Sequence, residues 1–247
     1  MASLLRRLAR PAVLLPVGVP LGLYTFAKLN PDAATAYYKR AFAWGCARSM
    51  DFSEKKLTEL KQDVFAGLRE QGTGALQVLE IGVGGGNNFR YYPPGTSVIA
   101  VDPNPHFDQY LKENSDKYPD VKVTKFIVAG AEDMSGVAEG SVDAVVCTLV
   151  LCSVQDMDAS IREVKRVLKP GGKFYYLEHV RHPTNGRAQF MQDLLTPVFR
   201  VLSDGCHVNR ETWKHLEGAG FTEVKYRIEG NLRPKFMTQI LYGTATK

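Results

Sequence analysis

The chain has 247 residues, of which 45 % are hydrophobic and 23 % are charged. This composition excludes a disordered protein, and the length suits one large domain with an appendage. The formal net charge of +5 is mild and the basic residues are scattered, so a solvated basic face is expected, with an anionic surface as the alternative partner. The four cysteines form no C-x-x-C pair and no metal-ligand spacing with histidine, which predicts reduced thiols facing the cytosol and no metal site.

The first fifty residues differ in kind from the rest. Arg6, Arg7 and Arg10 precede an apolar run of 17 residues, 11–27, which three prolines and two glycines interrupt. This length is the lower limit for spanning a bilayer, and the prolines disfavour a straight spanning helix. A secretory signal would need a cleavage site that the run lacks, and a mitochondrial transit peptide is the alternative. We therefore expect a membrane-associating segment over residues 1–50, which lies in the membrane interface, and an enzyme domain over 51–247.

Beyond residue 50 the pattern is that of a soluble enzyme. Asp51 and Glu54 have capping-box spacing, which predicts a helix that begins at Asp51 and ends at the glycines of residues 72–74. Strands are then expected over 77–81, 97–102, 123–129, 142–150, 173–179, 222–230 and 236–245. Helices are expected over 105–117, 158–168 and 211–219, with a further helical insert over 185–202. The alternation predicts right-handed βαβ units and a parallel sheet with helices on both faces.

A cluster of glycines follows the first expected strand. Glu80, Gly82, Gly84 and Gly86 fit the pattern E-x-G-x-G-x-G, whereas the dinucleotide pattern G-x-G-x-x-G fails because Asn87 replaces its last glycine. Backbone amides at the start of an expected helix can hold an anion or a polar cofactor. A tight turn without a ligand is the alternative interpretation.

An acidic residue ends the second expected strand. Asp102 comes 20 residues after Gly82, where a carboxylate can accept hydrogen bonds from both hydroxyls of an adenosine ribose. Pro103 and Asn104 follow it and complete the expected cofactor loop. A helix N-cap is the alternative role for Asp102. The glycine pattern and this carboxylate, in this order, predict an adenosine-containing cofactor.

These features together resemble the class I S-adenosylmethionine-dependent methyltransferases, over roughly residues 76–247. The resemblance implies an α/β, Rossmann-like fold with a seven-stranded, mostly parallel sheet whose last strand is antiparallel, and S-adenosylmethionine as cofactor. In the segment AGAEDM, it implies that Ala131 offers a backbone amide and that Glu132 or Asp133 offers a carboxylate to the adenine. It further implies contacts with the methionine side of the cofactor from the end of the fourth strand: Cys147, Thr148 and Leu149.

Six further segments narrow the resemblance: YYPPG, DPNPHF, CTLVLCSVQ, EVKRVLKPGG, LEHV and DGCHVNRETW. They resemble the small methyltransferase-like thiol methyltransferases of the endoplasmic reticulum and lipid droplets. This implies methyl transfer to a small lipophilic acceptor, an alkyl thiol in the first place, by a membrane-attached enzyme whose catalytic domain faces the cytosol. A mitochondrial location is the alternative.

Several other functions stay open at this point. An oxygen acceptor on a lipophilic or quinone-like molecule is the alternative within methyltransferases. A nicotinamide oxidoreductase and a non-catalytic membrane or lipid-droplet scaffold are the alternatives outside them. The loop after the fourth strand lacks the [Asp/Asn]-Pro-Pro-[Tyr/Phe] pattern of nucleobase amine methylation, so no nucleic-acid partner is expected.

Methyl transfer to a thiol is an in-line displacement that needs alignment and only modest deprotonating help, because a thiol has a pKa of about 8.5. The candidates for that help are Glu178, His179, Asp204 and Cys206, with His207 as a weaker one, and each has a structural role as the alternative. The apolar residues of the helical insert are expected to cover the substrate crevice, with ordinary core packing as the alternative: Phe190, Met191, Leu194, Leu195, Val198 and Phe199.

Overall fold

The structure is a computed structural model that describes residues 25, 27–70, 75–230 and 239–247. The chain divides between Trp44 and Gly45 into two compact units. Residues 1–24 and 26, about half of the expected membrane-associating segment, lie outside the described residues, and so its attachment mode stays a prediction. Among the described residues, no helix is both long enough and apolar enough to cross a membrane.

The first long helix, α3, spans Pro31–Glu70. The predicted start at Asp51 is therefore wrong, because the helix runs through that position without a break. A proline suits the first position of a helix, where its fixed φ costs nothing, and Asp32 adds a favourable negative charge in the first turn. The capping-box spacing is a local preference, which the helical residues on both sides of Asp51 override.

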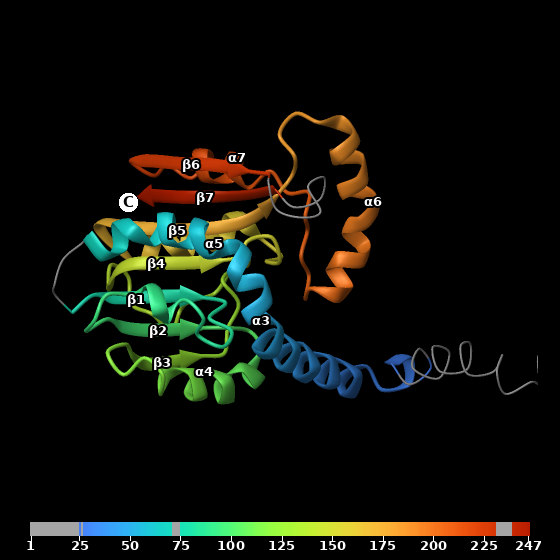
Figure 1. Ribbon diagram of the computed structural model, residues 1–247, viewed down its shortest axis with the longest axis horizontal. Coiled ribbons are helices and arrows are strands. Elements are labelled where there is room, and N and C mark those ends of the chain that lie inside the picture. The colour runs from blue at the N-terminus through green and yellow to red at the C-terminus, as the bar shows by residue number, and fades with distance from the viewer. Residues whose placement is uncertain (1–24, 26, 71–74, 231–238) are drawn as a thin grey trace, which may run out of the picture. The chain divides into compact units, whose positions relative to one another are not determined.

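Seven strands form one sheet in the order β3-β2-β1-β4-β5-β7-β6 (Figure 1). Strand β7 runs antiparallel to both of its neighbours, and the other neighbouring pairs are parallel. The bounds are β1 Gln77–Ile81, β2 Ser97–Val101, β3 Lys122–Ile127, β4 Val142–Thr148, β5 Leu168–Val180, β6 Glu223–Glu229 and β7 Gln239–Thr246. This confirms the predicted Rossmann-like methyltransferase sheet, and it places the switch in strand order between β1 and β4, where ligands bind in such folds.

The helices after α3 match the predicted ones, except that the helix expected directly after the glycines is absent. They are α4 Asp108–Ser115, α5 Met157–Val167, α6 Gly186–Leu202 and α7 Thr212–Gly218, with 3-10 helices η1 Phe89–Tyr91 and η2 Pro105–Phe107. The α-helix expected directly after the glycines does not form, and only the three residues of η1 are helical there. Pro93 and Pro94 explain this difference, because proline cannot donate to a helix and disfavours helical φ and ψ in the residue before it.

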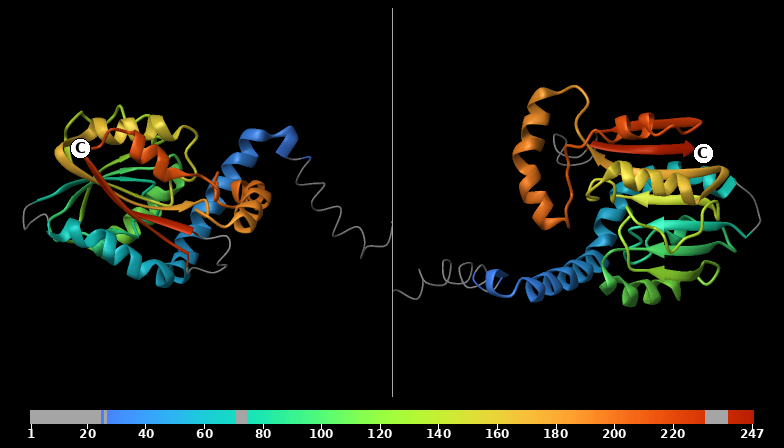
Figure 2. Two further views of the ribbon diagram at one scale, coloured as in Figure 1. Left: turned by 90° about the horizontal axis from the view of Figure 1, so that it is seen from above. Right: turned by 180° about the vertical axis from the view of Figure 1, so that it is seen from behind.

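Helices cover both faces of the sheet (Figure 2), and an apolar cluster lies on each face. On one face, α5 and α7 pack Ile161 and Leu216 against strand residues such as Phe174. On the other face, Phe65 of α3 belongs to the cluster that includes Tyr175. Successive residues of a strand point to opposite faces, so Phe174 and Tyr175 belong to the two different clusters. Since both faces are covered, the carboxyl ends of the parallel strands remain for a ligand.

Candidate cofactor and substrate site

The loop after β1 brings its backbone close to two neighbouring side chains. Gly82 has φ of +61°, and a Cβ added there would lie 2.2 Å from Cγ2 of Val150. Gly86 has φ of +77°, and a Cβ there would lie 2.7 Å from Cε2 of Phe89. The amides of Gly82 and Gly86 donate to backbone carbonyls within the protein, so these glycines serve close approach as well as an open backbone.

Asp102 lies just beyond β2 and is only 4 % exposed. Its Oδ2 accepts a hydrogen bond from the amide of Gly84 at 3.1 Å, and its Oδ1 accepts one from the amide of Asn104 at 2.8 Å. The capping role belongs to Asn104, whose side chain accepts from the amide of His106 at the start of η2. Each oxygen of a carboxylate has two lone pairs, so Asp102 retains acceptor capacity for hydroxyl groups. Pro103 is exposed beside it.

Glu80 is buried, and it binds two residues that follow the glycine loop. Its Oε1 accepts from Nδ2 of Asn88 at 2.8 Å, and its Oε2 accepts from the hydroxyl of Tyr92 at 2.7 Å. Burial raises the pKa of Glu80 from 4.5 to about 7, against the lowering effect of these two hydrogen bonds. Its carboxylate therefore shapes the loop, and its predicted contact with the cofactor stays a prediction.

Asn88 is a site residue that the sequence reasoning missed. Its Nδ2 also donates to Oγ1 of Thr148 at 3.0 Å, which joins the loops after β1 and β4. Its Oδ1 is buried and has no hydrogen-bond partner among the described residues. An acceptor without a partner is suited to a ligand group that donates a hydrogen bond. The signal in the sequence was a pair of polar residues directly after the glycines.

The raised pKa of Glu80 implies that the free energy of unfolding depends on pH. Between pH 4.5 and about 7 the folded chain keeps the Glu80 proton and the unfolded chain releases it, so the free energy of unfolding falls as pH rises. We expect Glu80→Gln to remove a slope of about 1.4 kcal/mol per pH unit in this window. Urea unfolding of both proteins at a series of pH values measures it. Parallel curves for the two proteins would contradict it.

The loops after β3 and β4 meet through Glu132. Its Oε1 accepts from the amides of Gln155 at 2.7 Å and Asp156 at 3.3 Å. Asp133 is exposed, and a hydrogen bond from the amide of Ser135 lowers its pKa. Ala131 is buried between them and the sheet. Both carboxylates have acceptor capacity left, so the choice between Glu132 and Asp133 for the adenine stays open.

Glu178, at the end of β5, is fully buried and fixes the loop after β4. Its Oε1 accepts from the thiol of Cys147 at 3.3 Å and from the amide of Val150 at 3.0 Å, and its Oε2 accepts from the amide of Cys152 at 3.2 Å. Burial raises its pKa. Leu149, in the same loop, has φ of +59°, a strained value for a side chain of this kind. The carboxylate predicted to assist catalysis is thus engaged in positioning the loop.

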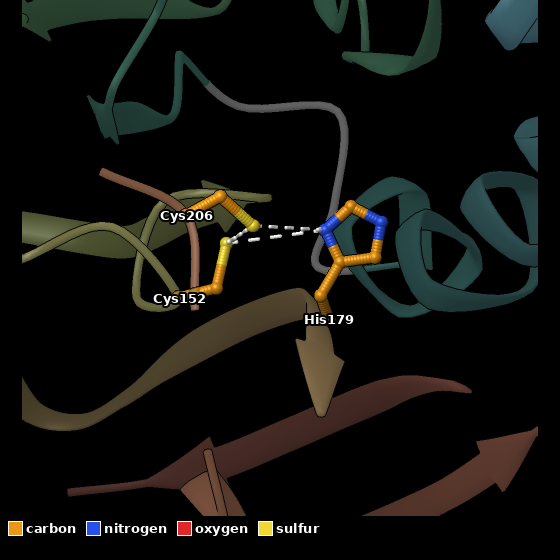
Figure 3. Close-up of side chains that lie close together, drawn as sticks. All are labelled: Cys152, His179 and Cys206. Atoms are coloured by element: carbon orange, nitrogen blue, oxygen red, sulfur yellow. Dashed lines mark hydrogen bonds between the residues drawn. The ribbon is translucent and has the colours of Figure 1, made fainter. Parts of the chain in front are cut away.

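Two of the remaining catalytic candidates come together with a third residue. The Sγ atoms of Cys152 and Cys206 lie 3.4 Å apart, and Nδ1 of His179 lies 4.0 Å and 3.6 Å from them respectively (Figure 3). The thiol of Cys206 and burial raise the pKa of Cys152. Burial lowers the pKa of His179, but contacts with Cys152 and Glu178 outweigh this and raise it. The sequence spacing predicted no metal-ligand group, but the fold assembles one that could hold an ion.

Asp204 occupies the turn that delivers Cys206 to this cluster. It has φ of +45°, and the next residue, Gly205, has φ of +93°. A Cβ at Gly205 would lie 3.1 Å from the carbonyl oxygen of Ser153, so the turn passes closely against the loop after β4. The predicted role of Asp204 in catalysis stays a prediction. The structure shows that Asp204 forms part of the turn that leads to Cys206.

Helix α6 divides the apolar residues that were expected to cover the crevice. Phe199 packs against the buried group of Cys152, Cys206 and Val208. Phe190, Leu194 and Val198 are between 50 % and 66 % exposed, so they do not belong to the packed core, and their place over the substrate crevice stays a prediction. A helix presents different faces every few residues, and the face of α6 that carries these three side chains points to solvent.

Comparison with known proteins places this arrangement in a family. A methyltransferase-domain family model matches residues 79–176. The human Thiol S-methyltransferase TMT1A is 40 % identical over 212 residues, which are 85 % of this chain and 87 % of that protein. The chain belongs to this family of methyltransferases. The human Thiol S-methyltransferase TMT1B is 42 % identical, over 70 % of this chain and 72 % of that protein.

A solved structure supports the fold of this methyltransferase. The crystal structure of the [4+2]-cyclase SpnF has a TM-score of 0.56 and 17 % identity, and the match covers 75 % of this chain and 79 % of that one. At this identity the likeness speaks for the fold alone. The sequence identity to the thiol S-methyltransferases carries the assignment to the family.

This methyltransferase uses S-adenosylmethionine as its cofactor, and the residues present fit that molecule. Asp102 is a buried carboxylate with acceptor capacity for the ribose hydroxyls. The orphaned Oδ1 of Asn88 is an acceptor suited to the ammonium group of the methionine part. The glycine loop between them carries no side chain at Gly82, Gly84 or Gly86, which leaves room for a ligand against the backbone.

Proposed function

We propose that this enzyme transfers a methyl group from S-adenosylmethionine to the sulfur of a small, lipophilic alkyl thiol. The products would be a methyl thioether and S-adenosylhomocysteine. The observation that carries the proposal is the group of the buried Cys152 and Cys206 with the half-buried His179 at the carboxyl edge of the sheet, in a chain 40 % identical to a thiol S-methyltransferase. Phe199 and Val208 pack beside the two thiols and give them apolar surroundings, which suit a small apolar acceptor.

In this reaction the protein would position the cofactor and the acceptor and exclude water from the site. When bound, S-adenosylmethionine supplies an electrophilic methyl group on a sulfonium sulfur. Asp102 and Asn88 would hold the cofactor, and Glu178 fixes the loop after β4, which carries Cys152. Phe199 and Val208 keep the neighbourhood of Cys152 and Cys206 apolar. Alignment and desolvation of this kind supply much of the rate of a displacement.

The experiment that tests this proposal is a comparison of acceptors. The full chain in detergent is incubated with S-adenosylmethionine labelled in its methyl group and with matched alkyl thiols, alcohols, phenols and amines. We expect label in the thioether of the alkyl thiol above all others. Preferential labelling of a phenol or a quinol would favour the alternative O-methyltransferase, and absence of cofactor binding would favour a non-catalytic scaffold.

We also propose that the enzyme works at a membrane surface, at the endoplasmic reticulum or a lipid droplet, with its catalytic domain in the cytosol. Arg6, Arg7 and Arg10 can meet anionic headgroups at about 1 kcal/mol each. The apolar run over 11–27 can enter the acyl boundary while the backbone groups that its prolines leave unpaired stay near water. A lipophilic thiol that partitions into the membrane would reach the active site from there.

Deletion of residues 2–30 is expected to release the enzyme from membranes without loss of cofactor binding, because the cofactor loop begins only at Glu80. Flotation with vesicles that contain anionic lipid compares the full chain, the truncated chain and a variant with Arg6, Arg7 and Arg10 replaced by serine. The truncated chain should stay unbound, and the serine variant should bind more weakly than the full chain. A truncated chain that floats with the vesicles would show that the attachment lies elsewhere.

A further inference from the structure

We propose that Cys152, Cys206 and His179 form a binding site for one zinc ion, and that the fourth position of this ion takes the sulfur of the substrate. The first part stands on the structure alone. The second part rests on the proposed function, because it requires a thiol as the acceptor.

The distances between the three ligand atoms already suit a tetrahedral ion. Zinc bonds of about 2.3 Å to sulfur and about 2.0 Å to nitrogen place neighbouring ligand atoms about 3.5 to 3.8 Å apart. The observed separations are 3.4 Å between the two Sγ atoms, and 3.6 Å and 4.0 Å from these to Nδ1 of His179 (Figure 3). The side chains point toward one another from three separate segments, so binding would need shifts of only a few tenths of an ångström.

The backbone around the cluster is held in strained conformations that bring these side chains together. Leu149 and Asp204 are the non-glycine residues with positive φ among the described part of the chain, and they lie three and two residues from the two cysteines. Glu178 binds the amide of Cys152, and the amide of His207 donates to the carbonyl of Cys152 at 2.8 Å. Strain of this kind persists where the surrounding structure enforces it, and it gathers at functional sites.

One charged side chain near the cluster, Arg210, favours a bound thiolate, whereas the buried Glu178, which accepts from the amide of Cys152, opposes it. Zinc with two cysteine thiolates is neutral, and a third thiolate would leave one negative charge. Arg210 lies beside the cluster, where its Nη1 donates to the carbonyl of Leu151 at 2.7 Å, and its guanidinium can offset that charge. Two sulfur ligands and one imidazole are also the donor set that selects zinc over magnesium or calcium.

Three protein ligands leave one position of a tetrahedral ion open, as in catalytic zinc sites. The substrate thiol would exchange with a water molecule there, and its S–H bond would break with transfer of the proton to solvent. A thiol that coordinates zinc is deprotonated outright, so the sulfur would be held as a thiolate without a strong protein base. The methylated product is a neutral thioether, a weak ligand that water can replace.

Metal binding is tested first without any turnover. The reduced full chain, in detergent, is titrated with Zn²⁺ and with Co²⁺, whose absorption spectrum reports thiolate ligands and tetrahedral geometry. We expect about one equivalent of tightly bound metal per chain and a sulfur-to-cobalt charge-transfer band. A wild-type chain that shows no such band would overturn the proposal, including the case where the two thiols only form hydrogen bonds or a disulfide.

Variants then assign the ligands. Cys152→Ser and Cys206→Ser should each lower zinc affinity by more than the roughly 10- to 100-fold that loss of an outer-shell contact costs. Cys147→Ser is the matched control, because Cys147 is an equally buried thiol that donates to Glu178 and is not part of the cluster. It should keep the metal. Equal metal binding by all three variants would overturn the site, and circular dichroism verifies that each is folded.

Substrate coordination is tested on the cobalt-loaded chain with S-adenosylhomocysteine present. A small alkyl thiol should raise the charge-transfer intensity by about half, because three thiolates then replace two, and the alcohol of the same chain length should not. An unchanged spectrum together with thiol methylation would leave the proposed function in place and overturn the zinc–substrate contact. A changed spectrum without methylation would retain the metal contact and contradict the proposed function.

Discussion

Replacement of Asp102 by alanine is expected to lower the affinity for S-adenosylmethionine by roughly ten- to a hundredfold. A hydrogen bond to a charged group contributes about 1.5 to 3 kcal/mol, which corresponds to this change in the dissociation constant. The carboxylate is 4 % exposed and also accepts from the amides of Gly84 and Asn104, so its loss loosens the loop as well as the ribose contact. Calorimetric titration of the purified chain with the cofactor measures the effect.

Two variants control this measurement. Asp108→Ala removes a nearby carboxylate that pairs with Lys112 at the surface of α4, and it should leave the affinity unchanged. Asp102→Asn keeps one oxygen acceptor without the charge, and it should fall between the wild type and Asp102→Ala. Wild-type affinity in a folded Asp102→Ala protein would remove Asp102 from the cofactor site.

Gly82→Ala is expected to destabilise the enzyme by about 2 to 5 kcal/mol. A positive φ costs a residue with a Cβ roughly 1 to 2 kcal/mol, and overpacking adds about 1 to 3 kcal/mol. The new Cβ would lie 2.2 Å from Val150. Val150 cannot move away freely, because its amide donates to Glu178 and the amide of Leu149 donates to the carbonyl of Leu177. Cofactor affinity should fall too, since the loop must shift.

The matched control is Gly95→Ala. Gly95 has φ of +85°, but a Cβ there meets nothing within 4 Å, so this variant should show only the conformational cost. Denaturant unfolding of both variants separates the two contributions to the free energy of unfolding. If Gly82→Ala is no less stable than Gly95→Ala, the close contact with Val150 does not hold this loop in place.

The sequence predicted the fold well because the order of strands and helices depends on local patterns. Short β-rich runs and the alternation with helices locate β1 and β2, and a residue directly after a strand, such as Asp102, must lie at the edge of the sheet. The roles of individual side chains were harder to predict. Glu80 was expected to bind the cofactor and Glu178 to assist catalysis; both stay predictions, and the structure adds that hydrogen bonds engage these buried carboxylates with the protein's own loops.

The sulfur cluster could not be read from the chain order. Cys152 and Cys206 are 54 residues apart, and their contact depends on the turn at Asp204 and Gly205, whose conformation is not signalled by any spacing rule. The start of α3 was missed for the opposite reason, because a strong local capping signal at Asp51 was overridden by the longer helical segment around it. Asn88 was missed because its role depends on Glu80 and Thr148, which other strands supply.

Thiol methylation is measured most directly by mass spectrometry of the product made from one alkyl thiol and S-adenosylmethionine with a deuterated methyl group. We expect a thioether that carries the intact deuterated methyl on sulfur, with S-adenosylhomocysteine formed in equal amount, and a strong decrease of both products with Asp102→Ala. A wild-type enzyme that binds the cofactor but leaves the thiol unmodified, or a label found on oxygen or nitrogen of another acceptor, would contradict the proposed function.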